Sequence, residues 1–198
     1  HKLALQFGVL DNFFDSGEVS GDGHVWSTAA IGTDYLEKTW QQNYRGSQRT
    51  YDYEGVVANG YPLLQKIPDV TEPESGYLWG DLAAHGKTYY HFAEYISSTF
   101  CNEVKVANPQ LGPMLEGRNC ARKEIAPSEA LPAEWGGGVN KWPWPIPLIA
   151  TNIATKPELV GHFAPESPDF NLLVPDQIRF AVFARHLKVW IADKERGT

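Results

Sequence analysis

The sequence has no long apolar run and no excess of basic residues. No stretch reaches the roughly 18 apolar residues that a membrane helix needs, so we expect no membrane span. The formal net charge is −7, with 24 acidic against 17 basic residues. An acidic surface repels a phosphate backbone unless it contains a basic groove, and the sequence has no Lys/Arg cluster that would form one. Nucleic acid is therefore not an expected partner.

Cysteine is scarce as well, since the chain contains only Cys101 and Cys120. If they pair, they close a loop that is worth roughly 3 kcal/mol in the chain-entropy model. A pair of metal-bound thiolates is the alternative, but no CxxC pattern and no nearby histidine at ligand spacing accompanies them. We predict a disulfide, and with it a periplasmic or secreted protein, because disulfides persist in oxidising compartments.

Familiar catalytic motifs are also missing. The chain has neither a GxSxG nucleophile turn nor a glycine loop that ends in Lys-Ser/Thr. Its six histidines fall at no HxH or HExxH spacing. A reactive site in this chain must therefore be sought in a less regular pattern.

The first forty residues predict a strand, a turn and a helix. Residues 9–14 are largely apolar and predict a short buried strand, and residues 15–23 form a glycine-rich turn. Residues 24–40 then have helical spacing, with small side chains near the start that allow close packing on a strand. This order of elements indicates an α/β fold.

Further helices and one further strand are expected elsewhere. Residues 1–7 predict a helix, and residues 77–85 predict a second one that ends at Gly86. Residues 88–92 predict a strand. Residues 175 to about 193 predict a last helix, whose apolar face is formed by Phe180, Phe183, Leu187, Trp190 and Ile191.

Two stretches are expected to be mostly irregular: residues 41–75, and residues 101–170, which are rich in proline and glycine. The second stretch contains Trp135, Trp142 and Trp144. These rings either pack a long loop onto a core, which we favour, or form a platform for a carbohydrate or a lipid.

The most informative stretch for chemistry is residues 10–24, which brings acids, a hydroxyl and a histidine onto the predicted glycine turn. Ligands bind at such turns in open α/β sheets, and the free N–H groups of a helix start favour an anion. Ser20 is the hydroxyl placed to point into that space. Ser20 and Asp22 could instead only cap the helix. His24 is a candidate base or ligand, although a histidine there is more often a hydrogen-bonding partner.

Three segments resemble a known family. The first segment spans residues 10–40 and has the sequence LDNFFDSGEVSGDGHVWSTAAIGTDYLEKTW. It resembles the phosphoesterases that include bacterial acid phosphatases and phospholipases C, within the alkaline-phosphatase superfamily. The second segment, residues 76–90, has the sequence GYLWGDLAAHGKTYY, and the third, residues 174–180, has the sequence VPDQIRF. Both are similar to later parts of the sequences of that family. The resemblance implies part of an alkaline-phosphatase-like α/β sandwich that carries a long Pro/Gly/Trp-rich irregular region.

The same resemblance implies metal-dependent hydrolysis of a phosphate ester, either of a small molecule or of a lipid. It assigns Ser20 as the nucleophile and as a metal ligand, and it places His24 where phospholipase-type relatives have an Asn near the substrate phosphate. Asn12 and Asp22 are the candidate substrate-binding residues. A divalent metal ion is the expected cofactor of the intact protein.

The remaining family ligands, an acid–Asn pair and an Asp–His pair, would fall before His1 and beyond Thr198. We therefore expect residues 1–198 to form a single domain that is a piece of a larger phosphoesterase domain, with residues 101–170 as a mostly irregular insertion. The rest of its own chain is then a further partner. Because a metal needs several ligands, the piece alone is expected to be weakly active or inactive.

Two rival functions remain open. In the first, the chain is a member of the family that has lost its metals and uses the aromatic loop, which carries Trp135, Trp142 and Trp144, to bind a glycan, a lipid or a protein. A sulfatase or phosphonate hydrolase on the same fold is less favoured, because the residues after Ser20 do not supply the C/S-x-P-x-R context that sulfatases need.

Overall fold

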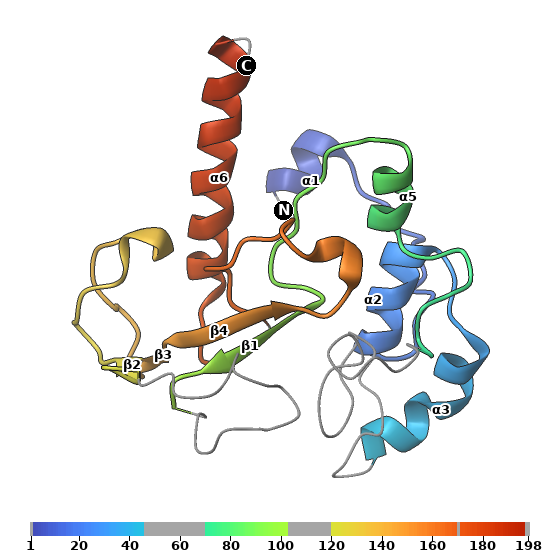
Figure 1. The fold of residues 1–198 in the computed structure, drawn as a ribbon, viewed down its shortest axis with the longest axis horizontal. Coiled ribbons are helices and arrows are strands. Elements are labelled where there is room, and N and C mark those ends of the chain that lie inside the picture. Colours follow the sequence, from blue (N-terminus) through green and yellow to red (C-terminus); the bar gives the residue numbers. More distant parts are fainter. Residues whose placement is uncertain (1, 46–69, 103–119, 170, 197–198) are drawn as a thin grey trace.

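A computed structural model gives the fold and describes residues 2–45, 70–102, 120–169 and 171–196. The described chain mixes helices with two small antiparallel sheets. Figure 1 shows a two-stranded ribbon in the middle, with the shorter helices on one side and the long C-terminal helix standing on the other. The predicted mixture of α and β structure is confirmed.

The N-terminal segment is helical at its start but contains no strand. Helix α1 spans Lys2–Phe7, as predicted. The strand predicted at residues 9–14 is wrong, because these residues form turns and coil. A strand needs a neighbour to take its backbone hydrogen bonds, and in the described chain this segment has no ladder partner. Its apolar side chains are largely exposed, from 65% at Val9 to 81% at Leu10.

The single helix predicted at residues 24–40 is two helices, α2 at Ser20–Ala29 and α3 at Asp34–Arg45. Helix α2 ends where Ala30 takes a left-handed conformation, with φ 59°. Thr33 then starts α3, since its Oγ1 accepts a hydrogen bond from Leu36 N at 3.2 Å. The prediction missed this capping residue.

Helix α5 spans Leu78–Ala84 and confirms the helix predicted at residues 77–85. Its end is closed as expected, because Gly86 has φ +62° and Lys87 N donates to Leu82 O at 2.8 Å. The strand predicted at residues 88–92 is wrong. Only one isolated bridge forms there, between His91 and Phe163, because the pairing partner β4 binds the residues that follow.

The central ribbon pairs β1 (Ile96–Phe100) with β4 (Ile149–Ala154), antiparallel, with Ile96 opposite Ala154. A smaller ribbon pairs β2 (Glu124–Ile125) with β3 (Ile146–Pro147). The stretch expected to be mostly irregular contains strands β2, β3 and β4 and the short 3-10 helices η2 (Ala133–Trp135) and η3 (Pro157–Leu159). The strand β4 was not predicted.

Two apolar clusters hold the fold together, and the central ribbon contributes to both. Ala154 of β4 belongs to the first cluster and Phe100 of β1 to the second. The first cluster also contains Val25, Leu36, Tyr77, Trp79, Tyr95 and Leu159. The second also contains Ile125, Trp135, Ile146, Ala164, Val174, Ile178 and Val182. Each cluster removes several large side chains from water, which is the main favourable term in folding.

Helix α6 spans Asp176–Arg196 and confirms the predicted last helix. It packs through Ile178 and Val182, which are buried. The apolar residues predicted to line one face are only partly covered, with exposed fractions from 38% at Phe183 to 67% at Phe180. Figure 1 shows that the far half of α6 extends beyond the rest of the described chain.

The predicted disulfide is confirmed. Cys101 follows β1 and is bonded to Cys120, with the two Cα atoms 5.7 Å apart. The bond closes a segment of sequence separation 19 and is consistent with an oxidising compartment.

Candidate functional site

A hollow of about 570 Å³ lies at the start of α2. Both residues predicted to carry the chemistry, Ser20 and His24, line it. The full lining is Asp15, Gly17, Glu18, Val19, Ser20, Gly23, His24 and Ser27. The structure therefore brings together the acids, the hydroxyl and the histidine of the glycine-rich segment.

Ser20 and His24 are one helical turn apart and share a face of α2, because residues i and i+4 of a helix are neighbours. Ser20 is the first residue of the helix and is exposed. The N-cap position belongs to Val19, whose backbone is extended at φ −138° and ψ 164°. Ser20 is therefore not the capping residue, and its side chain belongs to the wall of the hollow.

Asp22 has a structural position. It is fully buried, and its Oδ2 accepts a hydrogen bond from Glu18 N at 2.8 Å, which ties the glycine turn to the helix start. Its Oδ1 is buried without a hydrogen-bond partner in the described chain. Neither Asp22 nor Asn12, which is exposed, is part of the lining of the hollow.

His24 has a carboxylate partner that the sequence did not reveal. Glu94 Oε1 lies at hydrogen-bond distance from His24 Nδ1, although the two residues are 70 positions apart. The pair is partly covered, with 43% of the His24 side chain and 29% of the Glu94 side chain exposed. No local pattern marks Glu94 in the sequence, because only the tertiary fold brings it to α2.

The turn that carries Glu94 has an unusual backbone. Its neighbours Ala93 and Tyr95 are both left-handed, with φ 65° and φ 51°. This region is unfavourable for residues with a Cβ atom. Tyr95 is buried and fixed to the residue that follows β4, because its carbonyl oxygen accepts hydrogen bonds from Thr155 N at 2.9 Å and Thr155 Oγ1 at 2.8 Å. A side-chain contact of 3.0 Å also joins Tyr95 Oη to Thr28 Oγ1 on α2.

Behind this turn lies a buried lysine surrounded by aromatic rings. Lys156 is 1% exposed, and its Nζ lies 4.9 Å from the ring centroid of Tyr77 and 5.7 Å from that of Tyr95. Burial lowers the pKa of Lys156 from 10.5 to about 7, and the charge of Glu158 opposes this shift. Burial also raises the pKa of Tyr77.

The described residues do not form a metal site by themselves. No group of three His, Cys, Asp or Glu side chains in residues 2–45, 70–102, 120–169 and 171–196 could hold a metal ion. Ser20 lies beside Asp15 and Glu18 in the hollow, but this donor set is too small for the several ligands that a catalytic ion takes.

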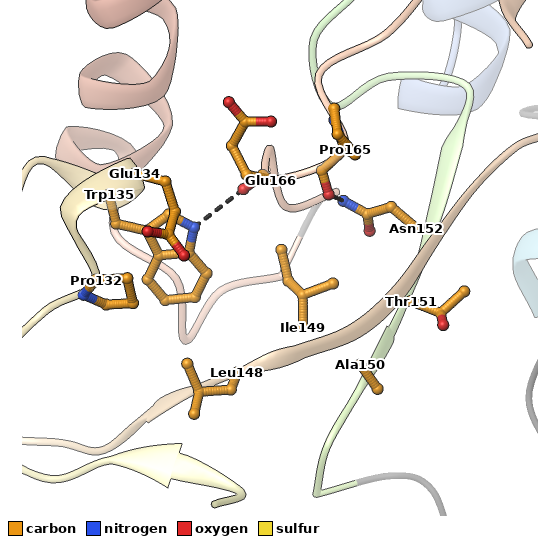
Figure 2. A pocket seen from close by; sticks show the side chains of 10 residues that line it. All are labelled: Pro132, Glu134, Trp135, Leu148, Ile149, Ala150, Thr151, Asn152, Pro165 and Glu166. Carbon is orange, nitrogen blue, oxygen red and sulfur yellow. Dashed lines mark hydrogen bonds between the residues drawn. The ribbon is translucent and has the colours of Figure 1, made fainter. Parts of the chain in front are cut away.

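A second hollow, of about 360 Å³, lies beside β4 and η2 (Figure 2). Two of its polar side chains are already engaged within the protein. Trp135 Nε1 donates to Glu166 O at 3.0 Å, and Asn152 Nδ2 donates to Pro165 O at 2.7 Å. Figure 2 shows the Glu166 carboxylate directed away from Ile149, and it pairs with Arg185 on α6. The first hollow is therefore the better candidate for chemistry.

The tryptophans of the long region differ in exposure. Trp135 is 4% exposed and belongs to the second apolar cluster, which agrees with the favoured packing role. Trp142 and Trp144 are half-buried. Trp144 Nε1 donates to Leu173 O at 3.0 Å, which fastens this loop to the segment before α6.

Comparisons with protein-family models, with curated proteins and with solved structures found no match to this chain. Within the part of the chain that the structure describes, no helix has the length and apolar character needed to cross a bilayer.

Proposed function

We propose that this chain carries the nucleophile region of a phosphate-ester hydrolase, with Ser20 as the nucleophile. The observation that carries the proposal is the shared hollow, in which the exposed Ser20 hydroxyl lies one helical turn from His24. The motif resemblance at residues 10–40 names the reaction class.

The residues of the hollow suit a displacement at phosphorus. Ser20 Oγ attacks phosphorus, the bond from phosphorus to the leaving oxygen breaks, and a phosphoserine forms; water then releases phosphate and restores the hydroxyl. His24 accepts the Ser20 proton and returns it to the leaving oxygen.

A divalent metal belongs to the proposal for the intact protein, where it would supply Lewis-acid stabilisation of the phosphoryl oxygens. Ser20 is the proposed ligand from this chain. The described residues do not complete a site, so we assign no further ligand and derive no step from the ion.

The proposed setting is an alkaline-phosphatase-like sandwich in a periplasmic or secreted protein. The Cys101–Cys120 disulfide supports an oxidising compartment. The proposed substrate is a small phosphate ester or a phospholipid, and the hollow of about 570 Å³ would hold its phosphate end.

The test is turnover of p-nitrophenyl phosphate by the intact protein with Ser20→Ala. We expect turnover to be abolished. Ser16→Ala is the matched control, because Ser16 is exposed in the same segment and lies outside the lining of the hollow. Wild-type turnover in the Ser20→Ala protein would rule out the assignment.

A further inference from the structure

We infer that Glu94 is a positioning residue for His24: it accepts the hydrogen bond from His24 Nδ1–H and so holds the imidazole in one tautomer beside Ser20. The geometric part stands on the His24–Glu94 contact alone. Its catalytic meaning rests on the proposed function.

The contact determines which nitrogen carries the proton. A carboxylate only accepts hydrogen bonds, so the hydrogen between His24 and Glu94 sits on Nδ1. In a neutral imidazole the lone pair is then on Nε2, where it can accept a proton. Because His24 lines the same hollow as Ser20, this tautomer is the one that suits a base for the Ser20 hydroxyl.

The scaffold holds Glu94 in place through its neighbour Tyr95. Ala93 and Tyr95 are left-handed, and Tyr95 is fixed by hydrogen bonds from Thr155 of the segment after β4. Thr28, one turn beyond His24 on α2, contacts the Tyr95 hydroxyl. The turn and the helix are thus joined at two points, one of which is the His24–Glu94 pair itself.

Stability alone gives a poor account of this arrangement. A partly exposed contact between a histidine and a carboxylate contributes little to folding because solvent screens it. The two left-handed residues, by contrast, make the turn less favourable. Unfavourable backbone that is retained around a charged side chain is typical of functional sites.

The first experiment reads the tautomer directly, by long-range ¹H–¹⁵N correlation on histidine-labelled intact protein at a pH where the imidazoles are neutral. We expect His24 to carry its proton on Nδ1. His186 is an internal reference that should carry its proton on the other nitrogen, Nε2, because that atom lies 2.8 Å from Glu166 Oε1. Glu94→Gln retains an acceptor and should keep the Nδ1–H form, whereas Glu94→Ala should lose it.

Two results would overturn the assignment: an Nε2–H tautomer of His24 in the wild-type protein, or an unchanged tautomer in Glu94→Ala. If Glu94→Ala does not fold, the wild-type spectrum still shows which nitrogen of His24 carries the proton and so tests the assignment.

The second experiment measures kcat and KM for p-nitrophenyl phosphate. We expect Glu94→Ala to lower kcat on the order of tenfold or more with little change in KM, and Glu94→Gln to recover most of that loss. Asp81→Ala is the matched control, because Asp81 also pairs with a histidine, His85, but on the exposed surface of α5.

The two proposals fail differently. An inactive Ser20→Ala protein together with unchanged kcat in Glu94→Ala would overturn the role of Glu94 alone. Full activity in Ser20→Ala would overturn the proposed function, and the tautomer spectrum would still test the contact.

Discussion

The hydroxyl of Thr28 lies 3.0 Å from the hydroxyl of Tyr95, one helical turn along α2 from the contact between His24 and Glu94. The helix that carries the proposed nucleophile is therefore joined to the turn at residues 93–95 by two polar contacts on one face. One of the four residues in these contacts, His24, also lines the hollow.

Removing the Thr28–Tyr95 contact should loosen that junction. Thr28→Val and Tyr95→Phe should each lower the free energy of unfolding by about 1 kcal/mol, the usual contribution of one hydrogen bond. Because both substitutions remove the same contact, the double variant should lose less free energy of unfolding than the two single variants lose when their losses are added. Urea unfolding of the four proteins measures the coupling, and strictly additive losses would contradict it.

Relief of the left-handed backbone should stabilise the turn. Ala93 has φ 65°, a conformation that glycine adopts without steric cost, so Ala93→Gly should raise the free energy of unfolding by about 0.5–1 kcal/mol. Ala83→Gly in α5 is the control and should lower it by about 1 kcal/mol, because Ala83 is helical and exposed. A loss of stability in both variants would show that the turn is not strained.

The buried Lys156 should make stability depend on pH. Its pKa is about 7 in the folded protein and 10.5 when unfolded, so between these values the unfolded chain binds more protons and stability rises with pH. Below about pH 7 the lysine is charged in both states, and burial of that charge costs stability in full.

Lys156→Met should remove this dependence. We expect the variant to be more stable than the wild-type protein at pH 6.5, with the difference shrinking towards pH 9.5. Urea unfolding at both pH values measures the difference in stability between the two proteins. Because the other titrating groups are the same in both proteins, their contribution to the pH dependence cancels in this difference. An equal loss of stability at both pH values would instead indicate that Lys156 stabilises the fold through the rings of Tyr77 and Tyr95.

Loss of the disulfide should weaken the fold. Replacing Cys101 and Cys120 by serine releases a segment of sequence separation 19, and the chain-entropy model gives a cost of roughly 3 kcal/mol. Urea unfolding of the double variant should match that of the reduced wild-type protein. Unchanged stability would mean that the bond does not constrain the unfolded chain.

Local signals in the sequence predicted the elements that depend on local interactions. Helix α5 follows from its apolar stripe and from Gly86, and α6 follows from periodic spacing after Pro175. The break between α2 and α3 was missed, although Gly32 and Thr33 supply a stop and a cap within the single helix predicted at residues 24–40.

Elements that depend on distant partners could not be predicted this way. Residues 9–14 have strand-like composition but no neighbour in the described chain, whereas β4 was missed because its partner β1 is about fifty residues earlier. Glu94 was missed for the same reason, since a carboxylate acquires a role only when the fold brings it to His24. Ser20 and His24 were singled out because both lie in residues 10–24, the short glycine-rich stretch that the motif resemblance covers, and the structure then places them one helical turn apart on α2.

The proposed reaction requires that Ser20 becomes covalently phosphorylated. The most direct measurement is acid quenching of the intact protein during turnover of a ³²P-labelled phosphate ester, followed by peptide mapping. We expect label on the peptide that contains Ser20 and none in the Ser20→Ala protein. Label on another residue, or turnover that continues in Ser20→Ala without any labelled peptide, would contradict it.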